Sequence, residues 1–231
     1  MSEFTPFPKI SRLNREIVIT EKLDGTNAAI NIELYLGTYI VTAQSRNRII
    51  TPGSDNYGFA RWVKQHEAAL VALLGEGLHF GEWWGLGIGR NYDLSERRFS
   101  LFNTAKWGTP EVEAQFAAAR ANGLAIYSVP VLYTGPWTGV FGFTDGATGE
   151  FLKLDADQKW PEVEGEANPR PRFAPNFILE WLKRNGSFAV PGFKSPEGIV
   201  IFHKASGTMF KVTTERDEEY KGVNRTQDER S

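Results

Sequence analysis

The chain has 231 residues, of which 23% are charged and 41% hydrophobic, a composition typical of a globular protein rather than a disordered or fibrous one. It contains no cysteine, which excludes disulfides, thiolate zinc sites and cysteine nucleophiles. The 26 basic and 28 acidic residues give a net charge of −2, so any nucleic-acid contact must depend on local positive charge rather than on a broad basic surface.

The N-terminal segment contains two prolines and no apolar core of the length that a signal peptide needs. The longest apolar runs of the chain are too short to cross a bilayer. We therefore expect a cytoplasmic protein without a membrane contact.

Segments rich in β-branched and aromatic residues predict strands. In chain order they are 17–20, 28–34, 39–44, 78–83, 99–102, 124–127, 139–143, 198–203 and 209–213. In the second of them, apolar Ile30 and Ile32 alternate with polar Asn31 and Glu33, which indicates one buried face. Leu36-Gly37-Thr38 then predicts a hairpin turn into the next strand.

Two helices are predicted in the middle of the chain. Apolar side chains recur three and four residues apart over residues 57–74, which indicates one amphipathic helix. A second helix is predicted to start with Thr109 as its N-cap and Pro110 in its first turn, and to stop at Gly123.

A third helix is predicted over residues 177–184, after Asn176 and before the stop signal Asn185-Gly186. The segment 155–175 before it contains four prolines among acidic residues, so it is predicted to be an irregular surface connection or, alternatively, a disordered linker. Interleaved strands and helices favour a single α+β domain over residues 1–213, followed by a charged tail over 214–231.

The most informative motif is Glu21-Lys22-Leu23-Asp24-Gly25-Thr26-Asn27, which directly follows an apolar strand. A lysine at a strand end beside an Asp-Gly turn can be held in place, and it becomes a nucleophile when desolvation or a nearby cation makes it neutral. An ordinary turn with a solvated lysine is the alternative, and this motif alone does not decide between them.

Lys-x-Asp-Gly resembles the signature of the covalent nucleotidyltransferases, which include polynucleotide ligases and mRNA capping enzymes. The longer string Glu-Lys-x-x-Gly-Thr-Asn is most similar to their RNA ligase 2 branch. Counterparts of the later family motifs follow in order at Ser45-Arg46-Asn47, FGEWWG from Phe80, FSLFN from Phe99, EGIVI from Glu197 and MFKV from Met209. The resemblance implies an ATP-grasp-like ligase fold, with antiparallel sheets flanked by helices around a nucleotide cleft.

The resemblance also implies catalytic roles for three residues. Lys22 would attack the α-phosphate of ATP and hold AMP through a phosphoramide bond. Glu197 would bind a Mg²⁺ or Mn²⁺ ion at the phosphates, and Lys211 would neutralise phosphate charge in the transition state.

The remaining motif residues would bind the nucleotide. The implied contacts are Glu21 for the adenine amino group, Asp24, Gly25 and Asn27 in the turn, Arg46 for the phosphates, Glu82 for the ribose and Phe102 for stacking on the base. Phe102 is preferred to Phe99 for stacking because it directly precedes the polar Asn103.

Two positions depart from the family pattern. Met209 replaces the first lysine of the usual Lys-x-Lys, so one cation near the triphosphate is missing or supplied elsewhere, with Lys204 as the candidate. Asp24 stands where some RNA ligase 2 relatives have histidine, which leaves the preference between RNA and DNA open. The residues after Val212 are too few for an appended OB-fold or helical domain, so none is expected.

The predicted function is that of an ATP-dependent RNA ligase that joins 5′-phosphate and 3′-hydroxyl ends through lysyl-AMP and an adenylylated 5′ end. The expected partner is RNA, as a nicked duplex or an RNA–DNA hybrid. A small ATP-dependent DNA ligase, a GTP-using capping enzyme and a non-catalytic module that binds nucleic-acid ends are the alternatives.

Overall fold

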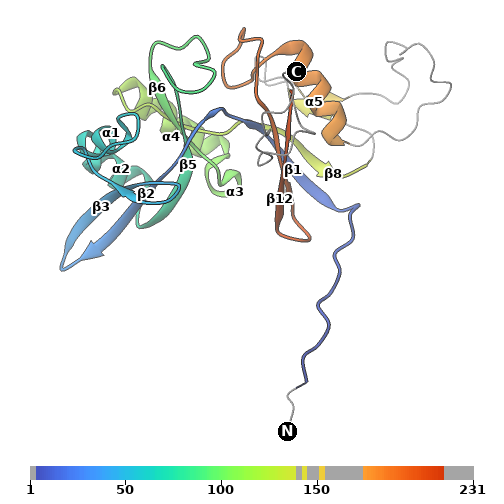
Figure 1. The fold of residues 1–231 in the computed structure, drawn as a ribbon, viewed down its shortest axis with the longest axis horizontal. Helices are drawn as coiled ribbons and strands as arrows, with labels where there is room; N and C mark the ends of the chain where they lie inside the picture. Colours follow the sequence, from blue (N-terminus) through green and yellow to red (C-terminus); the bar gives the residue numbers. More distant parts are fainter. Residues whose placement is uncertain (1–3, 139–141, 145–150, 154–173, 216–231) are drawn as a thin grey trace, which may run out of the picture.

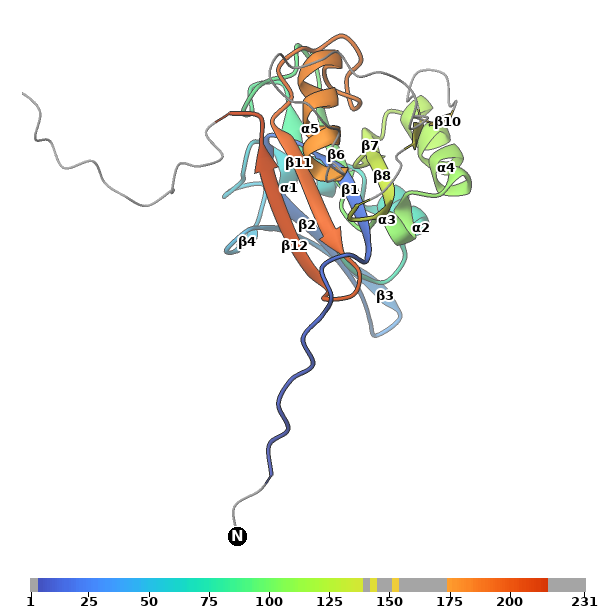
Figure 2. The ribbon, with the colours of Figure 1, turned by 90° about the vertical axis from the view of Figure 1, so that its right-hand side faces the viewer.

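The computed structural model describes residues 4–138, 142–144, 151–153 and 174–215, and Figures 1 and 2 show them from two sides. One sheet has six strands in the order β4 (Ile49–Ile50), β3 (Thr38–Ser45), β2 (Gly25–Tyr35), β5 (Gly77–Gly85), β6 (Arg97–Leu101) and β7 (Ile126–Ser128). A second sheet has four strands in the order β12 (Thr208–Thr213), β11 (Gly198–His203), β1 (Glu16–Lys22) and β8 (Val131–Pro136). β9 (Gly142–Thr144) and β10 (Phe151–Lys153) form a separate antiparallel pair.

Each large sheet packs one face against helices. The six-stranded sheet is covered by α1 (Phe59–Gln65), α2 (Glu67–Leu74), α3 (Thr104–Trp107) and α4 (Pro110–Ala121), which share its apolar core. The four-stranded sheet is covered by α5 (Ala174–Asn185), which packs on β1 and β11 (Figures 1 and 2). Mixed sheets with few helices confirm the predicted α+β class. No helix in the described ranges is long and apolar enough to cross a membrane.

The chain passes between the two sheets at Leu23-Asp24, the only residues that separate β1 from β2 (Figure 1). It passes back between β7 and β8, where Val129 and Pro130 stand. Leu23 and Val129 are both buried in one small cluster with Trp84. Both passages are therefore held by the same apolar contacts.

The single helix predicted over residues 57–74 is wrong, because α1 and α2 are separate helices that meet at His66. The His66 ring Nδ1 lies 2.8 Å from the carbonyl oxygen of Trp62, which the backbone N–H of His66 would use in a continuous helix. That N–H donates to the Val63 carbonyl at 3.1 Å instead. The apolar spacing continues across the break, so the periodicity of the sequence does not reveal it.

The strand predicted over 124–127 is shifted, since β7 begins at Ile126. Leu124 belongs to the turn after α4, where its N–H donates to the Ala119 carbonyl. The sequence analysis also missed β4, α3, β8 and β10. Prolines at positions 130 and 136 argued against a strand there, because proline is rare in strands except at the edge of a sheet. β8 is such an edge strand of the four-stranded sheet.

The start of the third helix was predicted too late. α5 begins at Ala174 rather than after Asn176, because Pro175 is tolerated in the first turn of a helix. The predicted irregular connection 155–175 is therefore shorter at its C-terminal end. Residues 155–173 of that connection, residues 139–141 of the strand predicted over 139–143, and the tail from residue 216 lie outside the described residues.

The hairpin predicted at Leu36-Gly37 is confirmed as a two-residue turn between β2 and β3. Leu36 and Gly37 have φ values of 49° and 80°, so both adopt the left-handed conformation of a type I′ turn. Leucine has a side chain that disfavours this conformation, and Leu36 is 88% exposed, so packing contributes little to holding it there.

We expect Leu36→Asn to raise the free energy of unfolding by about 0.5–1 kcal/mol, because asparagine tolerates the left-handed conformation and Asn-Gly is the preferred type I′ pair. Urea unfolding measures the change. Leu34→Asn is the matched control, since Leu34 is also exposed but lies within β2. Equal effects of the two substitutions would contradict a role for turn geometry.

Candidate active site

Lys22, the predicted nucleophile, is the last residue of β1 and pairs across the sheet with Gly198, the first residue of β11. This register brings Glu197, which directly precedes β11, beside the lysine. Lys22 Nζ lies 2.5 Å from Glu197 Oε2, and the side chains are 22% and 14% exposed. The structure therefore brings together the two residues to which the sequence assigned the chemistry and the metal.

The Glu197 carboxylate keeps acceptor capacity beyond this ion pair. Its buried Oε2 faces the Lys22 ammonium, and no hydrogen bond from another described residue adds to this contact. Among the same residues, no three or more His, Cys, Asp or Glu side chains gather into a metal site. Mg²⁺ commonly binds one or two carboxylates, with waters and phosphate oxygens as its other ligands, so Glu197 fits the protein's share of such a site.

Glu82 lies in the same cluster. Burial raises the pKa of Glu82 to about 7, the nearby Lys22 ammonium opposes this rise, and the Glu197 and Asp24 carboxylates add to it. The backbone N–H of Gly25 donates a hydrogen bond to the Glu82 carboxylate. Lys22, Glu197 and Asp24 thus all lie close enough to Glu82 to affect its ionisation.

Gly25 is required by close packing. A Cβ atom at this position would lie 2.5 Å from the carbonyl oxygen of Trp83 and 2.6 Å from the Cβ of Trp84, both on the neighbouring strand β5. Only glycine lets β2 begin directly against β5. The Lys-x-Asp-Gly motif therefore has a packing reason for its glycine in addition to any contact with a nucleotide.

The face of the six-stranded sheet that carries Glu82 also carries exposed aromatic side chains. Glu82 pairs with Asn27, and two residues earlier on the same face Phe80 pairs with Ala29. The N–H of Phe102 donates to the Phe80 carbonyl at 3.0 Å, which places these two phenylalanines side by side.

Phe102 is 39% exposed, whereas Phe99 is fully buried in the core on the opposite face. The preference for Phe102 over Phe99 as a stacking residue is consistent with these positions. The sequence analysis missed Phe80, which is 51% exposed. Its position two residues before Glu82 in the same strand was a signal for it, since alternate residues of a strand share a face.

Lys211 and Arg46, two of the predicted phosphate-binding residues, form no ion pair with another described residue. Lys211 pairs with Val200, which in turn pairs with Thr20, so Lys211 lies on the same sheet face as Lys22. Arg46 directly follows β3 at the end of the six-stranded sheet where β2 begins. Both side chains are exposed.

Lys204, the candidate to replace the missing motif lysine, lies far from Lys22. Its N–H donates to the carbonyl of Glu16 at the first residue of β1, and its side chain pairs with the Glu16 carboxylate. Glu16 lies six positions before Lys22 in an extended strand, a distance of about 20 Å. Lys204 therefore cannot supply the positive charge that is missing because Met209 occupies the position of the motif lysine.

Glu21 points away from Lys22, as alternate residues of a strand do. Its buried Oε2 accepts hydrogen bonds from the backbone N–H groups of Phe188 and Ala189, at 2.8 and 2.9 Å. Burial raises the pKa of Glu21, and its other oxygen, Oε1, has no hydrogen-bond partner among the described residues. Glu21 thus ties β1 to the segment after α5, and its predicted contact with adenine stays a prediction.

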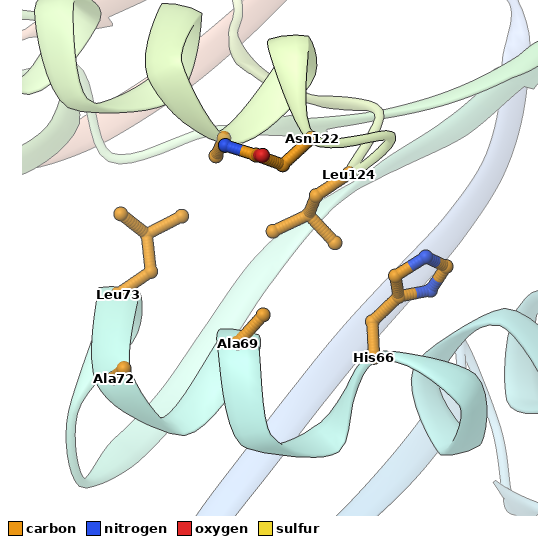
Figure 3. A pocket seen from close by; sticks show the side chains of 7 residues that line it. His66, Ala69, Ala72, Leu73, Asn122 and Leu124 are labelled. Carbon is orange, nitrogen blue, oxygen red and sulfur yellow. The ribbon is translucent and has the colours of Figure 1, made fainter.

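A cavity of about 330 Å³ lies elsewhere, between α2 and α4 (Figure 3). Its lining is mostly apolar, and His66, Leu73, Asn122 and Leu124 point toward it (Figure 3). None of the predicted site residues lines it, so this cavity is not the candidate site.

The model of the RNA ligase family matches residues 15–213. The chain belongs to the RNA ligase family. The matched range includes Lys22, Glu82, Glu197 and Lys211. No curated protein matches the chain.

Solved structures of the RNA ligase of Naegleria gruberi are similar to this family member. A variant with AMP and Mn has 18% sequence identity and a TM-score of 0.48, over 87% of this chain and 50% of that one. A variant with ATP and Mn has 19% identity and a TM-score of 0.47, over 87% and 49%. The protein with PPi has 20% identity and a TM-score of 0.46, over 87% and 50%. The chain thus spans about half the length of these proteins.

The raised pKa of Glu82 predicts how stability depends on pH in this RNA ligase family member. Between its ordinary value of 4.5 and its folded value of about 7, the folded state holds more protons than the unfolded state, so stability falls as the pH rises through this window. Glu82→Gln cannot ionise and keeps an oxygen that accepts from Gly25. We expect the variant to be more stable than the wild type by about 1–3 kcal/mol at pH 8 and to lose this slope.

Urea unfolding at pH 5, 6, 7 and 8 measures the difference. Glu76→Gln is the control, since Glu76 is exposed and lies just before β5. If the stabilities of Glu82→Gln and the wild type stay parallel over the whole pH range, burial of an ionised Glu82 does not cost stability.

Proposed function

We propose that this chain is an ATP-dependent RNA ligase whose residues 1–213 form the adenylyltransferase domain and whose residues 214–231 form a charged tail. The observation that carries the proposal is the contact between Lys22 and Glu197 at the passage between the two sheets. In a member of the RNA ligase family, a lysine held at this point beside carboxylates, with free cations on the adjoining faces, fits covalent nucleotidyl transfer.

The first step is attack by Lys22 on ATP. A bond forms between Nζ and the α-phosphorus, the bond from that phosphorus to the bridging oxygen breaks, and pyrophosphate leaves. Lys22 contacts Glu197, so the two side chains must separate, and the ammonium proton must pass to solvent before the Nζ lone pair can attack. Lys211 and Arg46 neutralise phosphate charge, the larger part of what a protein contributes to phosphoryl transfer.

Glu197 would hold a Mg²⁺ or Mn²⁺ ion through its carboxylate once Lys22 has moved away from Oε2, which accepts from no other described residue. When bound, such an ion supplies charge neutralisation at the phosphate oxygens. The requirement for Lys22 and Glu197 to separate fits this arrangement, because each partner then turns to a different part of the triphosphate.

The nucleoside would lie over the face of the six-stranded sheet that carries Glu82. The Glu82 carboxylate accepts hydrogen bonds from the ribose hydroxyls, Asn27 lies beside it on β2, and Phe102 stacks on the adenine. A nucleotide-binding cleft of the ATP-grasp-like ligase type would therefore lie between this face and the face of the four-stranded sheet with Lys22.

The later steps pass AMP from Lys22 to the 5′-phosphate of an RNA end, after which a 3′-hydroxyl displaces AMP and forms the phosphodiester. A nicked RNA duplex or an RNA–DNA hybrid holds both ends in line without a large clamping surface. Such substrates suit a chain with a net charge of −2, which lacks a broad basic surface.

The experiment that tests this function is intact mass after incubation with ATP and Mg²⁺. We expect the wild type to gain one AMP, and Lys22→Ala and Lys22→Arg to gain none. Arginine can keep the ion pair with Glu197, but it stays protonated and cannot act as the nucleophile. Lys64→Ala is the control, because Lys64 lies on α1 in an exposed pair with Glu67.

The same assay with GTP, and sealing assays with nicked DNA and nicked RNA, distinguish the alternative functions. An adduct with GTP instead of ATP would indicate a capping enzyme, and sealing of nicked DNA in preference to nicked RNA would indicate a DNA ligase. Folded protein that forms no adduct with any nucleotide would overturn the proposal and favour a module that binds nucleic-acid ends.

Phe102→Ala tests the position of the base. Loss of a base–aromatic stack of about 1–3 kcal/mol raises the half-saturating ATP concentration roughly 5- to 150-fold, and the thermal midpoint stays near the wild-type value because Phe102 is partly exposed. Phe99→Ala is the contrasting variant and is expected to lower the thermal midpoint strongly, since Phe99 is in the core. An unchanged ATP dependence in Phe102→Ala would exclude stacking on this residue.

A further inference from the structure

The segment between β5 and β6 has an unusual backbone. Five of its residues have positive φ, namely Gly87, Gly89, Asn91, Tyr92 and Asp93. The last three are consecutive and are not glycine; asparagine and aspartate tolerate the left-handed conformation, but the side chain of Tyr92 disfavours it. Such a run persists only where surrounding contacts determine it.

Those contacts are made with the passage between the sheets. The Tyr92 hydroxyl accepts a hydrogen bond from the backbone N–H of Asp24 at 2.9 Å. The Tyr92 ring is buried against Trp84 and Phe193, with ring centroids 4.8 and 4.7 Å apart. A Cβ atom at Gly89 would lie 2.6 Å from the Asp24 carbonyl oxygen, so the segment packs directly on the residue two positions after Lys22.

Arg90 lies between these two contacts and reaches three segments of the chain. Its Nη1 donates to the Ser195 carbonyl at 3.2 Å, its Nε lies 3.7 Å from Asp24 Oδ2, and its Nη2 lies 3.9 Å from Glu215 Oε2. The side chain is 24% exposed, and its Nε has no hydrogen-bond partner in the described part of the chain. One planar guanidinium thus joins points that are far apart in sequence.

Each of these points lies beside a residue of the Lys22–Glu197 pair. Asp24 is two residues after Lys22, and Ser195 is two residues before Glu197. Glu215 follows Thr214, whose N–H donates to the Glu197 carbonyl at 2.8 Å. Movement of the Arg90 guanidinium therefore shifts the supports of both the nucleophile and the metal-binding carboxylate.

We propose that Arg90 is a positioning residue that holds the loops of Lys22 and Glu197 at the separation that adenylyl transfer requires. This inference rests on the proposed function, because it assigns Arg90 a part in that reaction. Arg90 acts through Asp24 and the Ser195–Glu197 turn rather than on the nucleotide itself. Its charge and its fork geometry both contribute, because it binds carboxylates on two sides and a carbonyl on the third.

Arg120 provides a matched control. Its side chain pairs with the Glu113 carboxylate at 2.5 Å, donates to the Ile126 carbonyl at 3.0 Å, and is 22% exposed. It thus has the same kinds of partner and nearly the same exposure as Arg90. It lies on α4, on the helix-covered side of the six-stranded sheet, and touches neither Lys22 nor Glu197.

The first measurement is amide hydrogen exchange on nucleotide-free protein. In Arg90→Gln, we expect faster exchange at Asp24 and Thr214, whose N–H groups bond to Tyr92 and to the Glu197 carbonyl, and unchanged exchange at Ile19 in the middle of β1. Arg120→Gln should leave all three unchanged. Wild-type exchange at Asp24 and Thr214 in Arg90→Gln would overturn the inference, whatever the protein's activity.

The second measurement is the rate of adenylylation in a single turnover at several ATP concentrations. A small displacement of a reacting group can cost about 100-fold, so we expect Arg90→Gln to react about 10- to 100-fold more slowly, with the half-saturating ATP concentration within about twofold of wild type. Arg90→Lys keeps the charge without the fork and should recover only part of the rate. Arg120→Gln should react at the wild-type rate.

The possible outcomes separate this inference from the proposed function. If the wild type forms an adduct and Arg90→Gln forms it equally fast, the positioning role is wrong and the ligase proposal stands. A higher half-saturating ATP concentration at an unchanged maximal rate would make Arg90 a nucleotide contact and also overturn the positioning role. If the wild type forms no adduct, the proposed function fails and the role of Arg90 in it fails too.

Discussion

The site depends on the two places where the chain passes between the sheets. At one, Leu23 is buried between β1 and β2, and at the other, Val129 is buried between β7 and β8. Both pack on Trp84 and Tyr92, so a single apolar cluster sets how the ends of the two sheets meet. Lys22 directly precedes the first passage, and its position follows from the burial of its neighbour rather than from contacts of its own flexible side chain.

Charge is concentrated around this passage although the whole chain is nearly neutral. Glu197 contacts Lys22, Asp24 and Glu82 lie in the same group of charges, and burial makes the ionised form of Glu82 unfavourable enough to bring its pKa to about 7. An excess of carboxylates around one ammonium favours the arrival of further positive charge, such as a divalent ion. Arg90 already supplies part of that charge at Asp24. The local arrangement of charge, rather than the net charge, therefore favours a cation at this site.

The residue pattern was sufficient to predict those helices and strands in which the local preference of the residues agrees with their tertiary contacts. Alternation in β2 and the cap at Thr109, whose hydroxyl accepts from the Val112 N–H, are examples that the structure confirms. Pattern was insufficient where a side chain or a distant strand decided the outcome. His66 broke a helix that kept its apolar spacing, and β8 formed between prolines because β1 offered it an edge.

For the site, the sequence by itself predicted which residues would carry the chemistry and gave their order along the chain, because the motifs are short and local. Lys22, Glu82 and Glu197 were all identified in this way, and the family match includes them. Only the tertiary structure decided which of them meet. It showed Lys22 in contact with Glu197, Glu21 on the opposite face of its strand, and Lys204 at the far end of β1.

The contribution of Arg90 and Tyr92 also came from the tertiary structure alone. They stand in a segment that has no regular periodicity, and their partners lie 68 and 105 residues away in sequence, at Asp24 and Ser195. Contacts of that range depend on strand register and on how two sheets pack together. A local pattern of residues carries no information about either, and this is the physical reason that the sequence could predict candidate reacting groups but not what holds them in place.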